Sequence, residues 1–217
     1  MSDRDWWRYL RPHHPWGLAA ALAALTACLT WIGSTALTVP AQHPAGDSSV
    51  QARMVIALAC ATLIAGSLNS PMTDWETTAG TRLRRAELVH MVVAAAAGTV
   101  LLGVCEAVVR TPEAAAALFR AELIWLGLAL TCARLLGRAQ AWVLPLLTLF
   151  PLTYLGWDPT GTVRWWNWMW APPQAPACWA LAAASLAAAG LAHLATPWRL
   201  HHLRRTLRPK AVAPGSG

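Results

Sequence analysis

Long stretches without a formal charge constrain this chain more than any other feature of its sequence. The longest of the stretches discussed here begins at Trp165 and ends at Trp198, and it holds 34 residues. A helix of about 20 apolar residues crosses the roughly 30 Å hydrocarbon core of a membrane. Only 12% of the 217 residues are charged, against about 25% in soluble domains. These proportions exclude an ordinary soluble fold and predict an all-α, polytopic membrane protein.

Six uncharged or nearly uncharged windows are long enough to form such helices. The fourth is interrupted by Arg120 and Glu122. The fifth contains Pro145 and Pro151, which a membrane helix tolerates where its neighbours satisfy the freed carbonyls. The predicted spans cover residues 17–39, 54–69, 87–109, 112–136, 139–157 and 177–196.

The spans divide the chain into three parts. Residues 1–16 precede the six-helix transmembrane domain at 17–198, and a basic tail follows at 199–217. The first window could instead be a secretory signal sequence, because three arginines precede it. A signal sequence has an apolar region of about 7–15 residues, and this window is longer. We therefore favour an uncleaved first span.

Arginine and lysine are distributed unevenly between the two sets of helix ends. Positively charged flanks remain in the cytoplasm, so the richer set marks the cytoplasmic side. An even number of spans then places both termini in the cytoplasm. The alanine-rich composition, with arginine preferred over lysine, is typical of a bacterial plasma membrane protein, and the flanking positions of the charges argue against a nucleic-acid partner. The richer set holds Arg4, Arg8, Arg11, Arg82, Arg84, Arg85, Arg134, Arg138, Arg199, Arg204, Arg205, Arg208 and Lys210, and the poorer set holds Arg53, Arg110 and Arg164.

Two cytoplasmic segments are predicted to form short helices outside the spans. In residues 1–16, Trp6, Tyr9 and Leu10 share one helical side, which predicts an amphipathic elbow lying against anionic lipids. A frayed basic tail is the alternative. In the second segment, Ser70 before Pro71 favours a helix start.

The second short helix presents an apolar face with acidic neighbours. Met72, Trp75 and Ala79 lie at helical spacing, and Asp74 and Glu76 flank Trp75. A tether between spans does not require a tryptophan on its cytoplasmic face. The segment is therefore predicted either to dock on a partner or to place Trp75 at the lipid interface.

Charged residues within the spans are costly and mark a candidate polar site. Glu106 and Arg110 are four residues apart and can pair along the third span. Arg120 and Glu122 cannot face one another directly, because residues two apart on a helix point in different directions. Glu106, Arg120 and Glu122 are predicted either to surround a polar cavity or to join spans three and four. His193 in the sixth span is interpreted as a hydrogen-bonded core or interface histidine.

Tryptophans crowd the start of the longest uncharged stretch. Trp165, Trp166, Trp168 and Trp170 precede Pro172, and further prolines follow, so one continuous helix is excluded. The segment is predicted either to lie flat at the outer interface as an aromatic belt or to enter the membrane and return.

No sequence motif of nucleotide binding or hydrolysis is present. The chain has neither a phosphate-binding loop nor the HExxH or GxSxG patterns. Its five cysteines lie in apolar stretches without metal-ligand spacing. We therefore expect no enzymatic activity, metal or cofactor in this chain.

The layout of the chain resembles the permease subunits of ATP-binding-cassette exporters of the second type. The likeness extends from Trp6 to His202 and consists of an elbow helix, two spans, a short cytoplasmic helix, three spans, an aromatic stretch and a last span. It carries no invariant motif, and Arg120 and Glu122 match no family feature. The resemblance implies that Met72, Asp74, Trp75, Glu76 and Ala79 dock on a separate ATPase subunit.

The resemblance also implies the partners and the substrates. ATP and Mg²⁺ would be bound by the ATPase, and a second permease copy or paralogue would complete a dimer. The tryptophan stretch would be the outer re-entrant segment. A peptide, an antibiotic or a lipid-linked compound would be exported.

Two other interpretations remain open. A substrate-capture subunit of a vitamin importer has a similar size and would dock through small residues such as Ala19, Ala20 and Ala23. A non-transporting assembly or scaffold protein would use the alanine-rich sixth span for close helix packing.

Overall fold

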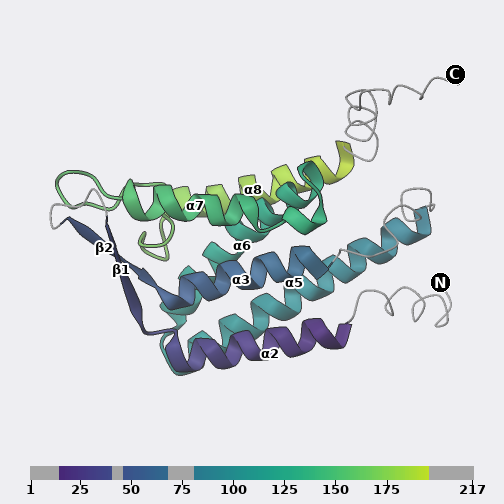
Figure 1. The fold of residues 1–217 in the computed structure, drawn as a ribbon, viewed down its shortest axis with the longest axis horizontal. Coiled ribbons are helices and arrows are strands. Elements are labelled where there is room, and N and C mark those ends of the chain that lie inside the picture. The colour runs from purple at the N-terminus through teal and green to yellow at the C-terminus, as the bar shows by residue number, and fades with distance from the viewer. Residues whose placement is uncertain (1–14, 41–45, 68–80, 196–217) are drawn as a thin grey trace, which may run out of the picture.

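The fold is an up-and-down bundle of helices with a β-hairpin at one end (Figure 1). A computed structural model of the chain describes residues 15–40, 46–67 and 81–195. Six longer helices run alternately in opposite directions, so that α2, α5 and α7 begin at the end where α3, α6 and α8 finish (Figure 1). These helices are α2 Pro15–Ile32, α3 Ala52–Ser67, α5 Thr81–Val109, α6 Pro112–Leu135, α7 Val143–Tyr154 and α8 Pro176–Ala195.

Helix α6 lies at the centre of the bundle. It packs most extensively against α8 and α3, and it also contacts α5 and α7. Its start is set by sequence, because the Thr111 side chain accepts a hydrogen bond from the Ala114 backbone N–H at 3.1 Å and Pro112 follows at the first helical position. The predicted fourth span, 112–136, is therefore confirmed as a helix nearly to the residue.

A glycine allows α6 and α8 to approach closely. A Cβ atom added at Gly127 would lie 2.5 Å from the backbone carbonyl carbon of Ser185, well inside van der Waals contact. Any other residue at this position would push the two helices apart.

The β-hairpin was not predicted. Strand β1 (Ala36–Pro40) pairs antiparallel with β2 (Asp47–Gln51), where the predicted first span was expected to continue to residue 39. The apolar window included Leu37 and Val39 because hydropathy does not separate strand from helix. Thr38 and Val39 are β-branched residues that favour an extended backbone. Span one is thus corrected to a helix that ends at Ile32.

Three helices are long and apolar enough to cross a membrane, and they support assignment as a membrane protein. Among the described residues these are Leu88–Val109, Pro112–Leu135 and Pro176–Leu194. Helices α2 and α3 are apolar but shorter, and α7 has only 12 residues where 139–157 was predicted. Six membrane-spanning helices are therefore not supported by length and composition.

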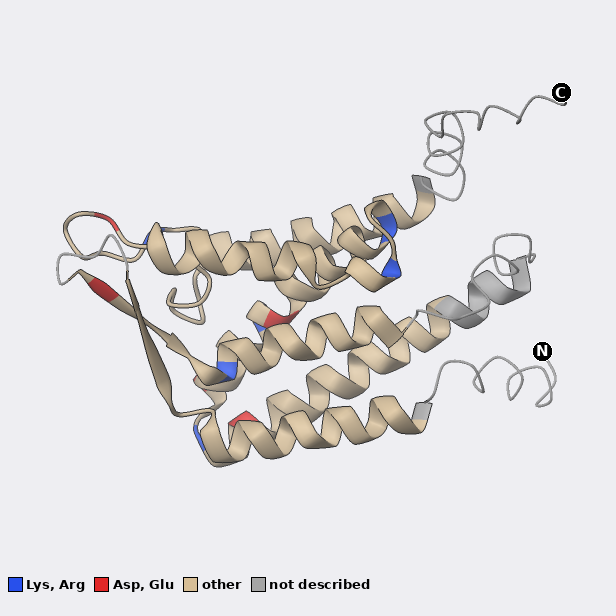
Figure 2. Cartoon of the chain, viewed as in Figure 1, with Lys and Arg blue, Asp and Glu red and all other residues tan. Residues whose placement is uncertain are grey.

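Charged residues lie mainly at the two ends of the bundle (Figure 2). We call the end with β1, β2 and residues 155–175 the hairpin end. We call the opposite end, where α6 and α8 finish beside Arg134 and Arg138, the basic end. The long middle of the bundle is uncharged except for one place on α6, where Arg120 and Glu122 lie. Residues 1–14 of the predicted elbow at 1–16, the segment 68–80 in which a short docking helix is predicted, and the tail at 199–217 lie outside the described residues.

Candidate functional site

The buried charges of the bundle separate into three environments, beginning with Arg120. Its guanidinium is fully buried and donates to four backbone carbonyls of the segment between α7 and α8. The Nη2 atom lies 3.1 Å from the Trp168 oxygen and 2.8 Å from the Ala171 oxygen. The Nη1 atom lies 2.6 Å from the Pro172 oxygen and 3.2 Å from the Pro173 oxygen.

Two prolines explain why an arginine is needed there. In a helix the carbonyl of Trp168 would accept from residue 172, and the carbonyl of Pro172 would accept from residue 176. Both donors are missing, because Pro172 and Pro176 have no backbone N–H. The Arg120 guanidinium supplies a hydrogen bond to the Trp168 carbonyl, which would be costly to bury without a partner. It adds a second hydrogen bond to the Pro172 carbonyl, which also accepts from the Ala175 backbone N–H at 3.0 Å. Arg120 is therefore a structural group, and its donors are directed at the protein backbone.

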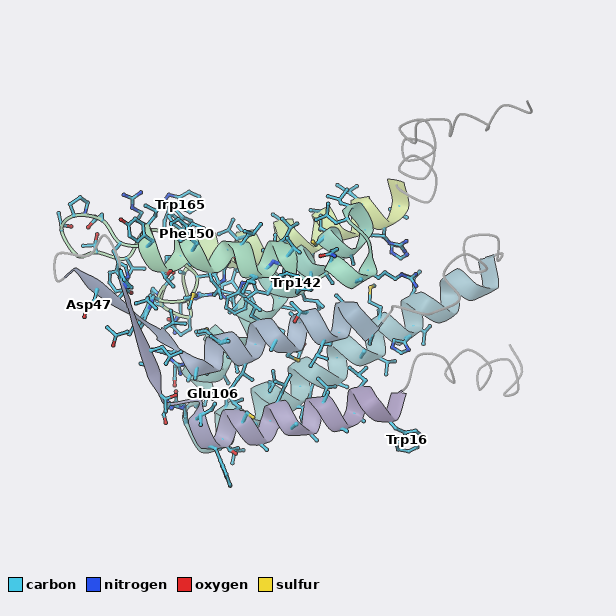
Figure 3. The ribbon with its side chains drawn as sticks, viewed as in Figure 1. Trp16, Asp47, Glu106, Trp142, Phe150 and Trp165 are labelled. Atoms are coloured by element: carbon cyan, nitrogen blue, oxygen red, sulfur yellow. The ribbon has the colours of Figure 1, made fainter. Side chains whose placement is uncertain are left out.

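The tryptophan segment, residues 155–175, packs into the bundle instead of forming a simple lipid-facing belt. Trp168 is only 8% exposed and meets Trp125 of α6 edge-on, with ring centroids 6.3 Å apart. Trp166 and Trp170 pack partly buried against the same core. Trp165 differs, because it is 68% exposed at the hairpin end (Figure 3).

Asn167 is a structural residue of this segment that the sequence analysis missed. Its side chain is fully buried, and Nδ2 donates to the carbonyls of Leu152 at 3.2 Å and Gly156 at 3.1 Å. These bonds satisfy the carbonyl end of α7. A lone amide within the tryptophan-rich stretch was the signal that could have identified it.

Glu106 forms the second environment, a small ion-pair cluster at the hairpin end (Figure 3). Its carboxylate is 1% exposed and lies 3.0 Å from the Arg53 Nη1 atom and 3.5 Å from the Arg110 Nε atom. The predicted pair with Arg110 is confirmed. Arg53 was missed as a partner because the second span was predicted to begin one residue later, at 54, whereas Arg53 lies in the first turn of α3.

Glu122 forms the third environment and has no ionic or hydrogen-bonding partner among the described residues. The side chain is 1% exposed, and neither carboxyl oxygen accepts a hydrogen bond there. It lies beside the Cys60 thiol of α3 and the Thr99 hydroxyl of α5. The Thr99 hydroxyl donates instead to the Ala95 carbonyl at 2.7 Å. A buried acid without a partner is rare in stable cores and frequent at functional sites.

The structure does not unite the three predicted polar residues in one cavity, and it gives no ion pair between α5 and α6 from Arg120 or Glu122. Arg120 contacts the tryptophan segment, Glu106 contacts arginines, and Glu122 faces α3 and α5. A single cavity around all three is therefore not found among the described residues. Glu122 of α6 does lie beside Thr99 of α5, so the alternative that these residues join spans three and four stays a prediction. Of the three, Glu122 is the residue whose charged group makes no hydrogen bond with the described residues.

Other predicted residues have mixed outcomes. His193 is hydrogen-bonded as expected, since the Arg134 Nε atom lies 3.0 Å from its Nδ1 atom. The docking residues Met72, Asp74, Trp75, Glu76 and Ala79 lie outside the described residues. Within residues 15–40, 46–67 and 81–195, no group of three or more His, Cys, Asp or Glu side chains is placed to hold a metal ion. No family model, curated protein or solved structure matches this chain.

Proposed function

We propose that this chain is a permease subunit of an ATP-binding-cassette exporter, which moves a peptide, an antibiotic or a lipid-linked compound out of a bacterial cell. In this proposal the bundle crosses the plasma membrane six times with both termini in the cytoplasm. A separate ATPase subunit binds ATP and Mg²⁺, and a second permease copy or paralogue completes the transporter.

The observation that carries the proposal is the folding of the tryptophan segment into the hairpin end. A bundle that only tethers other proteins needs no such segment between its last two helices. Here Arg120 gives its donors to that segment, and Trp168 is buried within the core. A structured segment before the last span is the feature by which the layout resembles this exporter class.

The alternating direction of the six helices supports the same proposal. Helices α2, α3 and α7 are shorter than a full span, and the β-hairpin and the tryptophan segment extend the bundle beyond their ends (Figure 1). Arg134 and Arg138 lie at and just beyond the end of α6 and belong to the set of helix ends that is richer in arginine and lysine, which the positive-inside rule assigns to the cytoplasm. The hairpin end carries the poorer set, Arg53, Arg110 and Arg164.

The proposal is tested by coupling to the ATPase. If Met72, Trp75 and Ala79 form an apolar docking face, Trp75 should dominate the interface, because a buried central aromatic often contributes 2 kcal/mol or more. Trp75→Ala should leave the protein folded in the membrane while lowering co-purification with the ATPase. Glu76→Lys should act in the same direction if the partner surface is basic.

Trp31→Ala is the matched control for this experiment. Trp31 is 86% exposed at the end of α2, at the hairpin end, where a cytoplasmic ATPase cannot reach it. Trp166 is a weaker control, because its side chain packs against the core. Equal ATPase recovery with Trp75→Ala and Trp31→Ala would contradict the exporter proposal and favour the scaffold. External labelling of either terminus would also contradict it.

A further inference from the structure

A cavity between three helices at the basic end combines apolar walls with arginine side chains. Its volume is about 360 Å³, comparable to about a dozen water molecules. The walls come from α5, α6 and α8 and are almost entirely apolar, so water is a poor occupant. They are formed by Leu88, Met91, Leu130, Leu186, Gly190 and Leu194.

One side of this cavity is cationic. Arg134, Arg138 and His193 contribute to its lining, and no acidic residue lines it in the part of the chain that the structure describes. Arg134 and His193 are joined by a hydrogen bond that connects α6 to α8. An apolar hollow with basic groups on one side is complementary to a molecule with an anionic head and a hydrocarbon tail.

The depth of the cavity fits a lipid of the surrounding membrane. Leu88 is the first residue of the apolar span in α5, and Arg138 lies just beyond the end of α6. The apolar walls therefore lie where hydrocarbon begins, and the arginines lie where phosphate groups are found. Leu194 is 76% exposed, so the cavity is bordered by a surface open to lipid.

We propose that this cavity binds one anionic phospholipid of the bilayer, with its phosphate at Arg134 and Arg138 and the start of an acyl chain between α5 and α8. The site does not depend on the exporter proposal. It requires only that the basic end face an anionic leaflet. The guanidinium groups have five N–H donors each, so binding phosphate is compatible with other hydrogen bonds that they make.

The test measures which lipid the purified full chain retains. The protein is reconstituted in nanodiscs containing equal amounts of phosphatidylglycerol and phosphatidylcholine, then extracted and examined by native mass spectrometry. We expect the wild-type protein to retain phosphatidylglycerol in preference. Arg134→Gln with Arg138→Gln should lower that retention about 30-fold, because each basic group contributes substantially to binding of an anionic headgroup. Arg164→Gln, an exposed arginine at the hairpin end, should have no effect.

A second variant separates loss of binding from loss of folding. A Cβ atom added at Gly190 meets nothing within 4 Å, so Gly190→Leu introduces a side chain at the cavity wall without a backbone clash. The substitution should favour the helix, since glycine is a poor helix former, and should exclude the acyl chain. Gly103→Leu is the control, because Gly103, a position on α5, also has open space around it and does not line the cavity.

The expected pattern is reduced phosphatidylglycerol retention in Gly190→Leu and in the double arginine variant, with an unchanged or raised Tm for Gly190→Leu. Equal retention of the two lipids by the wild-type protein would overturn the proposal. Full retention in both variants would do the same. Efficient disulfide cross-linking of Leu194→Cys between two copies in nanodiscs of phosphatidylcholine alone would show that a second copy covers the cavity instead.

Discussion

The hairpin end and the basic end use their arginines in different ways. At the hairpin end, Arg120 donates to four carbonyls, and Arg53 and Arg110 contact Glu106. At the basic end, Arg134 and Arg138 border an apolar cavity, and none of its described lining residues is acidic. The comparison indicates that the first end is built for rigidity, while the second offers a surface for a ligand.

The largest expected effect comes from Arg120→Met. This substitution keeps an apolar stem of similar length but removes every donor, so that the Trp168 and Ala171 carbonyls lose their side-chain partner. Each unpaired buried carbonyl costs about 1–3 kcal/mol, and we expect a loss of about 3 kcal/mol in total. An SDS unfolding titration measures it.

The control for Arg120 is Arg164→Met, at an exposed arginine of the same segment. Its effect should be within about 0.5 kcal/mol. Arg120→Lys should be intermediate, because an ammonium group has three donors and cannot reach all four carbonyls. If Arg120→Met and Arg164→Met unfold at the same SDS concentration, the hairpin end does not owe its rigidity to Arg120.

The second effect concerns the Glu106 cluster. Glu106→Gln removes the negative charge between Arg53 and Arg110 while keeping the shape of the side chain. Both arginines are partly solvent-exposed, at 17% and 31%, so water compensates in part. We expect the free energy of unfolding to fall by about 1–2 kcal/mol in the same titration. A change near zero would show that the Glu106 cluster does not stabilise the hairpin end.

Glu122→Gln is expected to have a much smaller effect on stability, although Glu122 is as deeply buried as Glu106. Neither Glu122 oxygen accepts a hydrogen bond among the described residues, so no such contact is lost. Replacing the carboxyl by an uncharged amide also avoids the cost of burying an ionised group, so the free energy of unfolding should stay unchanged or rise. If the chain is the permease proposed above, transport in reconstituted vesicles with its ATPase should nevertheless fall, because ionisable residues inside membrane-spanning helices commonly lie on substrate pathways.

The paired measurement on the two acids is the decisive one. Glu106→Gln should lower stability and spare transport in the folded fraction, and Glu122→Gln should do the reverse. If Glu122→Gln changes neither property, Glu122 has no functional role in the bundle. If it destabilises the protein as strongly as Glu106→Gln, the group has a structural partner.

Helix α6 illustrates what the sequence could predict about the fold. Its apolar length, the Thr111 cap and Pro112 define a helix by local chemistry alone, and the predicted limits agree with the observed ones. The β-hairpin and the short α7 could not be found in the same way. Hydropathy averaged over 20 residues does not distinguish strand from helix, and it does not register where a helix ends within an apolar window.

The sequence predicted which charged residues form the candidate site, but it did not predict most of their contacts. Glu106 and Arg110 are four positions apart on one helix, so their pairing follows from helix geometry. The acceptors of Arg120 lie about 50 positions later in the chain, and all are backbone atoms. Only the proline at 172, which removes a helical donor, marks the Trp168 carbonyl as one that needs another partner.

The smallest expected effect concerns Asp158, in the loop of the hairpin end. Its carboxylate accepts hydrogen bonds from the Thr160 hydroxyl at 2.6 Å and from the Thr160 and Thr162 backbone N–H groups at 2.9 and 3.0 Å. These bonds hold the pKa of Asp158 below its usual range. Because the folded-state pKa is depressed, the stabilisation is complete above the unfolded pKa of about 3.9 and is lost as pH falls through the lower folded value.

Asp158→Asn should therefore lower the Tm slightly at pH 7, by less than any substitution at Arg120 or Glu106. The difference from the wild-type protein should stay constant down to about pH 5 and shrink below it. A difference that instead grows on acidification would show that the loop does not favour the ionised carboxylate, and that hydrogen bonding at the hairpin end does not extend to its solvent-facing loop.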